Sequence, residues 1–170
     1  MKILIAYYSA AGSNYVGGSL KTLSMGNTEI VARMIQKEVG GDLFQIEGKI
    51  PYSSDYQTCL DESRRDIENG AKPALKELPK DLDSYDVIYL GYPVYWGTYP
   101  SFVSTFISLS SFEGKTVIPF ATSESTGAGH SVSDLKTALP KAVVKAGFSI
   151  YGSQAKQSEA RVKAGILANK

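Results

Sequence analysis

Residues 3–12 have the sequence Ile3-Leu4-Ile5-Ala6-Tyr7-Tyr8-Ser9-Ala10-Ala11-Gly12, an apolar run that ends in a loop of small residues. A short run that is apolar at every position is typical of a strand buried on both faces of a parallel sheet. From Asn27 the period changes, because apolar residues recur at spacings of three and four until Gly40-Gly41. This second pattern predicts a helix that ends at the glycine pair. The first part of the chain therefore predicts a strand, a loop and a helix.

The same alternation of strand and helix continues to the end of the chain. Further strands are predicted at 43–47, 87–91 and 116–121, and a fifth within 143–151. Helical spacing is found at 55–68, after Pro100, from about 131 and after 151. Five buried strands separated by helices predict a doubly wound α/β fold, with a five-stranded parallel sheet and helices on both faces. With no linker and no internal repeat, residues 1–170 are expected to form a single domain.

Composition excludes several classes of function. The net charge of +1 gives no basic excess, so we expect no nucleic-acid partner. No apolar stretch approaches the roughly 20 residues that span a bilayer, so we expect no membrane insertion. The chain begins with Met-Lys directly before a strand, without a signal-peptide pattern, and a cytoplasmic location is expected. Cys59 is the only cysteine, which excludes an internal disulfide, and its helical spacing with Tyr56 and Leu60 predicts a small core residue.

Ligands of such sheets bind beyond the carboxyl ends of the strands, where strand order reverses. The loop after the first predicted strand offers hydroxyl and small side chains, and the following helix begins at a glycine. Backbone N–H groups at a helix start attract phosphate, and polar side chains add hydrogen bonds. The alternative is that Asn27 or Thr28 only caps the helix. The candidate phosphate-binding residues are Ser9, Ala10, Ala11, Gly26, Asn27 and Thr28.

The loop after the third predicted strand is rich in aromatic residues and glycine. Aromatic faces can stack on a flat heterocycle, and glycine allows the backbone to approach its polar edge. The alternative is an aromatic cluster that covers the end of the sheet or contacts another protein. The candidate binding residues here are Pro93, Val94, Tyr95, Trp96, Gly97 and Thr98.

The loop after the fourth predicted strand, 122–131, combines small hydroxyl residues with a Gly-Ala-Gly sequence. It lacks the third glycine of a dinucleotide-binding fingerprint and follows the wrong strand, so it does not indicate NAD. Its small polar residues can hydrogen-bond the edge of a ring. The candidates are Thr122, Ser123, Glu124, Gly127 and Gly129.

Taken together, these segments resemble the flavodoxin-like FMN-binding family, in its bacterial branch with a Trp-Gly-Thr flavin loop. The resemblance rests on 3–9, Gly26-Asn27-Thr28, Gly91-Tyr92-Pro93, Trp96-Gly97-Thr98 and 114–120, in this order along the chain. It implies a sheet of order 2-1-3-4-5, with FMN phosphate on the first loop and isoalloxazine between the second and third. The chain departs from the family pattern by the residues inserted between Ala11 and Gly26, and by Met25 where a hydroxyl residue is usual.

The resemblance implies an FMN-binding redox protein, either an electron carrier or a small flavin reductase. Its partner would be a redox protein or a small-molecule electron acceptor. One alternative is an NAD(P)H-dependent FMN reductase of quinones. Another, from a different class, is a binding or regulatory module of the same fold without turnover.

The insertion 13–24 mixes glycines with Tyr15, Val16, Leu20 and Leu23. A disordered loop would need none of these apolar side chains. We therefore predict a folded flap beside the phosphate loop, with Tyr15 or Leu20 near the cofactor or a neighbouring subunit. The alternative is a surface excursion without a role at the site.

Overall fold

A parallel sheet with its strands in the order β4-β1-β5-β6 crosses the molecule, and β7 and β8 both pair with the outer side of β6. The computed structural model describes residues 1–124 and 127–170. The strands of this sheet are β1 (Ile3–Tyr7), β4 (Asp42–Gln45), β5 (Val87–Pro93), β6 (Thr116–Ser123), β7 (Val143–Val144) and β8 (Phe148–Tyr151). The predicted α/β class and the predicted strand order are confirmed.

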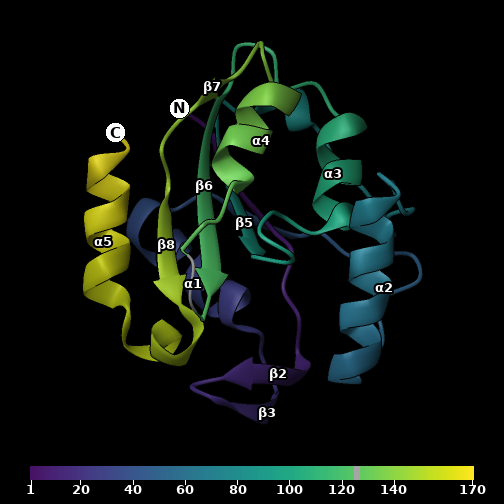
Figure 1. The fold of residues 1–170 in the computed structure, drawn as a ribbon. Helices are drawn as coiled ribbons and strands as arrows, with labels where there is room; N and C mark the ends of the chain where they lie inside the picture. Colours follow the sequence, from purple (N-terminus) through teal and green to yellow (C-terminus); the bar gives the residue numbers. More distant parts are fainter. Residues whose placement is uncertain (125–126) are drawn as a thin grey trace.

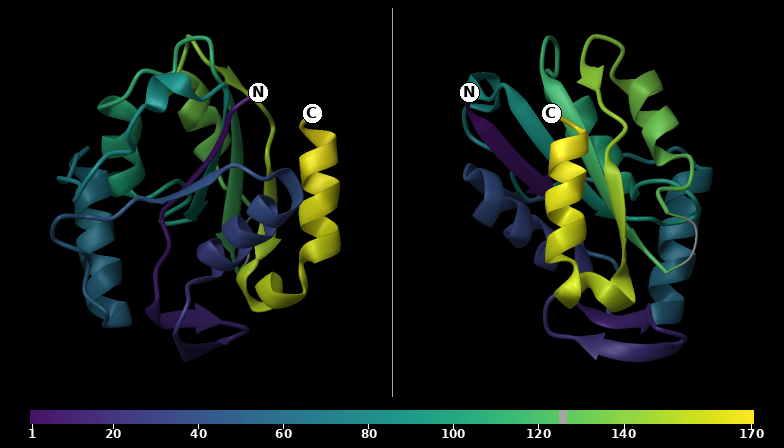
Figure 2. Two further views of the ribbon diagram at one scale, coloured as in Figure 1. Left: turned by 180° about the vertical axis from the view of Figure 1, so that it is seen from behind. Right: turned by 90° about the vertical axis from the view of Figure 1, so that its left-hand side faces the viewer.

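Helices cover both faces of the sheet, with α1 and α5 on one side and α3 and α4 on the other (Figures 1 and 2). α2 lies beside α3 and reaches the hairpin formed by residues 12–23. Among the described residues, no helix has both the length and the apolar character of a membrane span. The helices are α1 (Asn27–Val39), α2 (Tyr56–Glu68), α3 (Ser101–Ser108), α4 (Ser131–Ala138) and α5 (Glu159–Ala168), with 3-10 turns η1 (Leu82–Ser84) and η2 (Gly152–Gln157).

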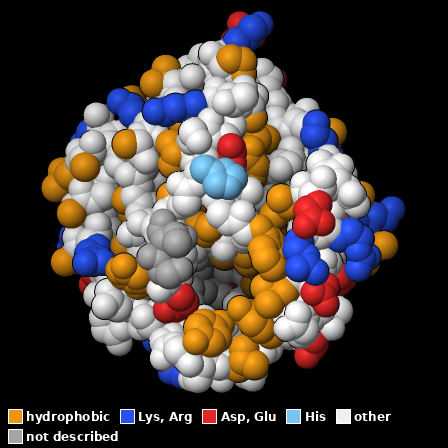
Figure 3. Space-filling view, viewed as in Figure 1, with side chains coloured by type: hydrophobic (Ala, Val, Ile, Leu, Met, Phe, Trp, Pro, Cys, Tyr) orange, Lys and Arg blue, Asp and Glu red, His pale blue; other side chains and the backbone are white. Residues whose placement is uncertain are grey.

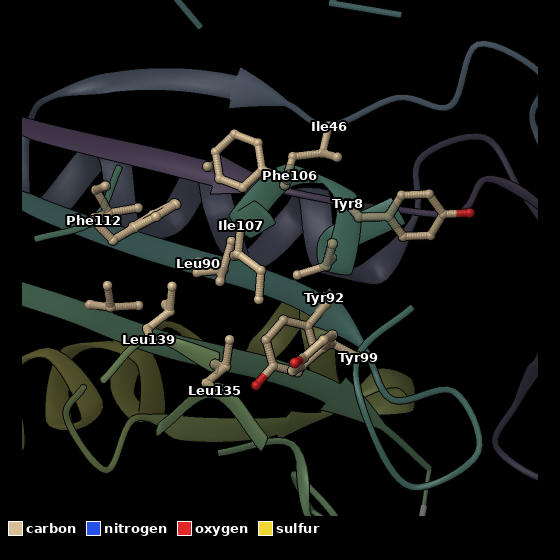
Figure 4. Close-up of a cluster of buried hydrophobic side chains, with 14 of the residues drawn as sticks. Tyr8, Ile46, Leu90, Tyr92, Tyr99, Phe106, Ile107, Phe112, Leu135 and Leu139 are labelled. Carbon is tan, nitrogen blue, oxygen red and sulfur yellow. The ribbon is translucent and has the colours of Figure 1, made fainter. Parts of the chain in front are cut away.

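The core has two halves because successive side chains of a strand point to opposite faces. In β1, Leu4 and Ala6 pack toward α3 and α4, whereas Ile5 and Tyr7 pack toward α1 and α5. Figure 4 shows the first half, in which aromatic rings from several elements surround β5. Burial on both faces explains why the strands are apolar at every position.

The fifth place in the sheet is divided between two short strands. β7 pairs with the first residues of β6 and β8 with its last, and the ladder is interrupted between them. Pro119 of β6 lies at the interruption and has no backbone N–H to donate. Opposite it, Gly147 has a φ of 71°, and any side chain there would collide with the Pro119 carbonyl. The prediction of one fifth strand within 143–151 is therefore corrected to two pieces.

The inserted segment folds into an antiparallel hairpin of β2 (Gly12–Val16) and β3 (Ser19–Leu23). It forms a two-stranded sheet of its own, separate from the main sheet. The hairpin lies at the end of the molecule toward which β6 and β8 point (Figure 1). The prediction that this segment is folded is confirmed, and it lies at the edge of the sheet formed by the carboxyl ends of the strands.

Gly91 of β5 provides a test of this packing. The ring of Phe120 on the adjacent strand lies where a Cβ of residue 91 would be, and Phe120 is completely buried. Gly91→Ala is expected to lower the free energy of unfolding by about 1–3 kcal/mol through overpacking, as measured by urea denaturation. A Gly91→Ala/Phe120→Leu double variant should lose less than the sum of its single changes, because leucine vacates part of that volume. Strictly additive losses would contradict the contact.

Candidate functional site

A cavity of about 490 Å³ lies where β1, β5 and β6 end, between the hairpin and α2. Figure 3 shows it as a hollow bordered by hydrophobic side chains. Its volume is within the range of cofactor sites, and its position beside the switch in strand order is where such sheets bind ligands. It is lined by Ala10, Ala11, Ser13, Asn14, Tyr15, Asn27, Thr28, Ser53, Tyr56, Cys59, Leu60, Ser63, Pro93, Val94, Tyr95, Trp96, Gly97, Thr122, Ser123, Glu124 and Gly152.

The start of α1 reaches the cavity with two backbone N–H groups that lack an acceptor among the described residues, those of Asn27 and Thr28. Gly26 occupies the N-cap position and has no side chain to satisfy them. The Ser9 hydroxyl, at the end of β1, accepts from the N–H of Glu29 at 3.1 Å. Free N–H groups at a helix N-terminus form an anion site, so this edge of the cavity favours a phosphate.

Thr28 does not cap the helix. Its hydroxyl lies 2.8 Å from the hydroxyl of Thr122 on β6, and both side chains are almost completely buried. When one of two hydroxyls donates to the other, the second keeps its hydrogen for a further acceptor. Among the described residues neither Thr28 nor Asn27 accepts a hydrogen bond from a helix N–H, so the capping alternative is wrong. The Thr28–Thr122 pair retains a donor beside the cavity.

The aromatic loop after β5 contains a tight turn. The backbones of Tyr95 and Thr98 exchange hydrogen bonds of 2.8 and 3.1 Å, and Trp96 and Gly97 between them have φ values of 55° and 82°. Two central residues with positive φ characterise a type I′ turn, in which a bulky aromatic side chain is strained. The strain at Trp96 is offset at α2, where its indole N–H donates to Ser63 Oγ at 3.1 Å.

Two hydrogen-bond donors, Tyr95 and Cys59, line the inner part of the cavity, and Tyr8 lies next to them without lining it. Tyr95 belongs to the turn and Cys59 to α2, and their close neighbour Tyr8 directly follows β1. Burial raises the pKa of Tyr95 well above its usual value, and the adjacent Tyr8 and Cys59 raise it further. Burial also raises the pKa of Tyr8 and of Cys59. All three therefore remain protonated at neutral pH.

The hairpin forms the outer wall. Tyr15 of β2 stacks on Tyr56 of α2, with ring centroids 6.4 Å apart and an interplanar angle of 29°. Asn14 Nδ2 donates to the carbonyls of Ala10 and Gly12 at 3.0 and 3.2 Å, which ties the hairpin to the loop after β1. The hairpin and α2 thus meet across the cavity through an aromatic pair.

The loop after β6 completes the wall near α1. Ser123 Oγ donates to the carbonyl of Gly127 at 2.9 Å, and Glu124 turns inward. A Cβ on Gly152 would lie 2.7 Å from both Glu124 Oε1 and Asn27 Nδ2, so three elements meet closely here. Ser125 and Thr126 of the same loop lie outside the described residues.

Comparison with known proteins identifies the family. Residues 2–164 match the family described as flavodoxin. The chain belongs to the flavodoxin family. A search of curated protein sequences gave no match.

Solved structures similar to this flavodoxin-family chain include two from Bacteroides, each provisionally classed as a flavoprotein. The protein from Bacteroides eggerthii is 31% identical, with a TM-score of 0.80 and coverage of 99% of this chain and 97% of its own. That from Bacteroides uniformis is 29% identical, with a TM-score of 0.76 and coverage of 95% and 97%. A flavoprotein from Lactobacillus acidophilus in complex with FMN is 20% identical, with a TM-score of 0.67 and coverage of 94% and 98%. The likeness to the last is evidence of a shared fold.

Most of the residues predicted for the site come together. The cavity is lined by the predicted residues Ala10, Ala11, Asn27, Thr28, Pro93, Val94, Tyr95, Trp96, Gly97, Thr122, Ser123 and Glu124, and not by Ser9, Gly26, Thr98, Gly127 or Gly129. The latter five support the loops instead. The Thr98 hydroxyl donates to Asp134 Oδ2 at 2.6 Å, away from the cavity, and Gly129 packs against the Gly97 carbonyl.

Sequence analysis missed the contribution of α2 to this flavodoxin-family cavity. Tyr56, Cys59, Leu60 and Ser63 form one stripe of the helix and line the cavity. The prediction that Cys59 is a core residue is therefore wrong, since the half-buried thiol belongs to the site. These residues have helical spacing, but the face that they form ends in a serine. This mixed polarity is the one feature of the sequence that could have indicated a site instead of the core. Gly152 and Ser53 also line the cavity and were not predicted, because the sequence around them has no pattern that indicates a site.

The thiol of Cys59 gives a chemical test of the inner wall. Thiolates are the reactive form, and burial raises the pKa of Cys59. Alkylation by iodoacetamide at pH 7.5 is expected to be slower than that of a short unstructured cysteine peptide, and to rise with pH beyond the point at which the peptide rate levels off. Mass spectrometry at several pH values would measure both rates. Equal rates and a common pH profile would mean that Cys59 is exposed.

Proposed function

We propose that the cavity binds FMN and that the chain is a flavodoxin-type redox protein. The observation that carries this proposal is the start of α1, where the N–H groups of Asn27 and Thr28 have no acceptor in the described part of the chain and lie beside a cavity of cofactor size. An anionic end group fits these donors, and the aromatic turn beyond them fits a flat ring. When bound, FMN would supply the electron-transfer chemistry, and the protein would position it and adjust its potential.

The residues present suit a terminal phosphate. The loop at Ala10 and Ala11 has small side chains, so a phosphate can approach its backbone closely. The N–H groups of Asn27 and Thr28 and the hydroxyl of the Thr28–Thr122 pair supply donors without a formal charge. Among the described lining residues there is no Lys or Arg, and the dipole of the 13-residue helix α1 takes the place of a cation.

The residues of the turn suit the isoalloxazine. Val94, Tyr95 and Trp96 present apolar and aromatic surface, and Gly97 of the turn also lines the cavity. The Tyr95 hydroxyl stays protonated, because burial raises its pKa, and so can donate a hydrogen bond but not take up a proton. This wall would hold the ring and exclude water from one of its faces.

Electrons would pass to a redox partner protein or to a small-molecule acceptor. The neutral donor set at α1 accommodates one phosphate group. The same donors would hold the FMN phosphate in an electron carrier and in an NAD(P)H-dependent quinone reductase, so the reaction with NAD(P)H decides between the two.

Purification of the protein tests the proposal. We expect a flavin absorption spectrum, either as isolated or after incubation with FMN, and chromatography of the extracted cofactor should identify FMN. Extraction of FAD alone, or failure to bind any flavin, would overturn the assignment. Rapid mixing with NADH and NADPH then distinguishes a reductase, which bleaches quickly, from a carrier, which does not.

Thr28→Val removes one donor from the phosphate end. FMN affinity is expected to fall roughly tenfold, because a charge-assisted hydrogen bond is lost. Riboflavin has no phosphate, so its affinity should stay within about twofold of wild type. Titration of flavin fluorescence measures both. Thr137→Val on α4, remote from the cavity, is the matched control; equal losses for FMN and riboflavin would assign Thr28 a structural role.

A further inference from the structure

One carboxylate oxygen in the cavity wall has no partner. Glu124 Oε1 is enclosed by protein, yet among the described residues no group donates a hydrogen bond to it. Burial of an acceptor without a donor is costly, and native structures seldom keep one without a reason. The side chain also lines the cavity, so a rotation of its carboxylate would bring an oxygen within reach of a donor on a ligand bound there.

The surroundings of Glu124 restrict what that ligand group is. Among the described lining residues, Glu124 is the only one with an ionisable carboxyl or amino group. An ionised carboxylate only accepts hydrogen bonds, so the facing atom must be a donor. The phosphate of FMN is largely deprotonated at neutral pH and does not qualify. The remaining donors of FMN are the ribityl hydroxyls and the ring N3–H.

Position decides between these two donors. Glu124 Oε1 and Asn27 Nδ2 lie against the same glycine, Gly152, at the start of α1. The proposed phosphate position is at this helix start, whereas the aromatic turn at Trp96 belongs to another part of the wall. The ribityl chain is covalently attached to the phosphate and must cross the cavity from this point. Its hydroxyls are therefore the donors that come nearest to Glu124.

We propose that Glu124 binds the ribityl chain, accepting hydrogen bonds from its hydroxyl groups, and thereby selects a flavin with a polyol side chain. This inference rests on the proposed function, since it assigns one residue of the FMN site. Glu124 also lies near the phosphate, so the same carboxylate opposes the dianion through like-charge repulsion. Among the described residues no group donates to this oxygen, and the cofactor would supply a donor.

Three flavins and two variants test the assignment. FMN has ribityl and phosphate, riboflavin lacks the phosphate, and lumiflavin lacks both. Glu124→Ala is expected to weaken riboflavin roughly tenfold or more, and FMN by no more than riboflavin, because repulsion of the phosphate is relieved as well. Lumiflavin affinity should remain within about twofold of wild type. Glu124→Gln should lose less than alanine with riboflavin, because the amide oxygen still accepts.

A second measurement separates binding from a structural role. Without flavin, Glu124→Ala should be at least as resistant to urea as the wild type, since the unpaired oxygen is removed. Glu113→Ala, which removes an exposed carboxylate far from the cavity, is the control and should leave all three affinities unchanged.

Several results would overturn the inference. If Glu124→Ala lowered the affinity for lumiflavin as much as that for riboflavin, the carboxylate would lie at the ring. If the variant bound FMN more tightly and riboflavin as before, the carboxylate would lie at the phosphate. Equal flavin affinities in wild type and Glu124→Ala would contradict any contact. All of these leave the proposed function intact, whereas a wild type that binds none of the three flavins contradicts the proposed function itself.

Discussion

A Gly26→Ala variant is expected to bind FMN about a hundredfold more weakly than the wild type, because two charge-assisted hydrogen bonds to the phosphate would be misplaced. A Cβ at this position would collide with Ser9 Oγ and would lie 2.7 Å from the Ala10 carbonyl oxygen. The second contact is with backbone, which cannot move aside by a rotamer change. The loop after β1 and the start of α1 must therefore separate, and the phosphate would lose its donors on one side.

Riboflavin serves as the internal comparison for Gly26→Ala. Its affinity should fall much less, since it does not use the N–H groups of Asn27 and Thr28. A Ser9→Gly/Gly26→Ala double variant removes the hydroxyl collision and should recover part of the FMN affinity. Fluorescence titration of both flavins would measure these effects. An FMN affinity within about threefold of wild type would show that the phosphate does not bind at α1.

Much of the fold could be predicted because a strand that is buried on both faces is apolar at every position of its sequence. Leu4, Ile5 and Ala6 are all buried, although they point to alternate faces, so the strand is a continuous apolar run. The end of α1 was equally readable, since Gly40 takes a φ of 71° at the C-cap. The division of the fifth strand could not be predicted, because it depends on Pro119 of β6 lying opposite Gly147, which is between β7 and β8.

The candidate site could be predicted where it follows strand ends, and not where it depends on how distant elements pack. Thr122 lies among the last residues of β6 and Trp96 in the loop after β5, and parallel strands bring their carboxyl ends to one edge. The orientation of α2 has no such rule. Ser63 is almost completely buried, and its hydroxyl accepts a hydrogen bond from the indole N–H of Trp96, 33 residues later. That contact exists only in the folded chain.

Deletion of residues 12–24, with Ala11 joined to Met25, is expected to raise the dissociation rate of FMN roughly ten- to hundredfold. Gly12 pairs with Leu23, so the two ends of the hairpin already lie side by side and the junction is short. Only Val16 of the hairpin is buried, and the free energy of unfolding should change little. The deletion removes Tyr15, whose ring stacks on Tyr56 across the cavity and would restrain a bound flavin.

The hairpin should also determine which electron acceptors reach the flavin. Its removal is expected to speed electron transfer to bulky acceptors more than to small ones, because a flap excludes by size. The recovery of FMN fluorescence would measure the rate of release. The rates of flavin reoxidation by acceptors of graded size would measure the size dependence of electron transfer. Tyr15→Ala should reproduce most of the faster release, whereas Leu20→Ala should not, since Leu20 is exposed and does not line the cavity. If the deletion leaves FMN affinity, acceptor range and oligomeric state unchanged, the hairpin is a surface excursion whose closure costs the chain little.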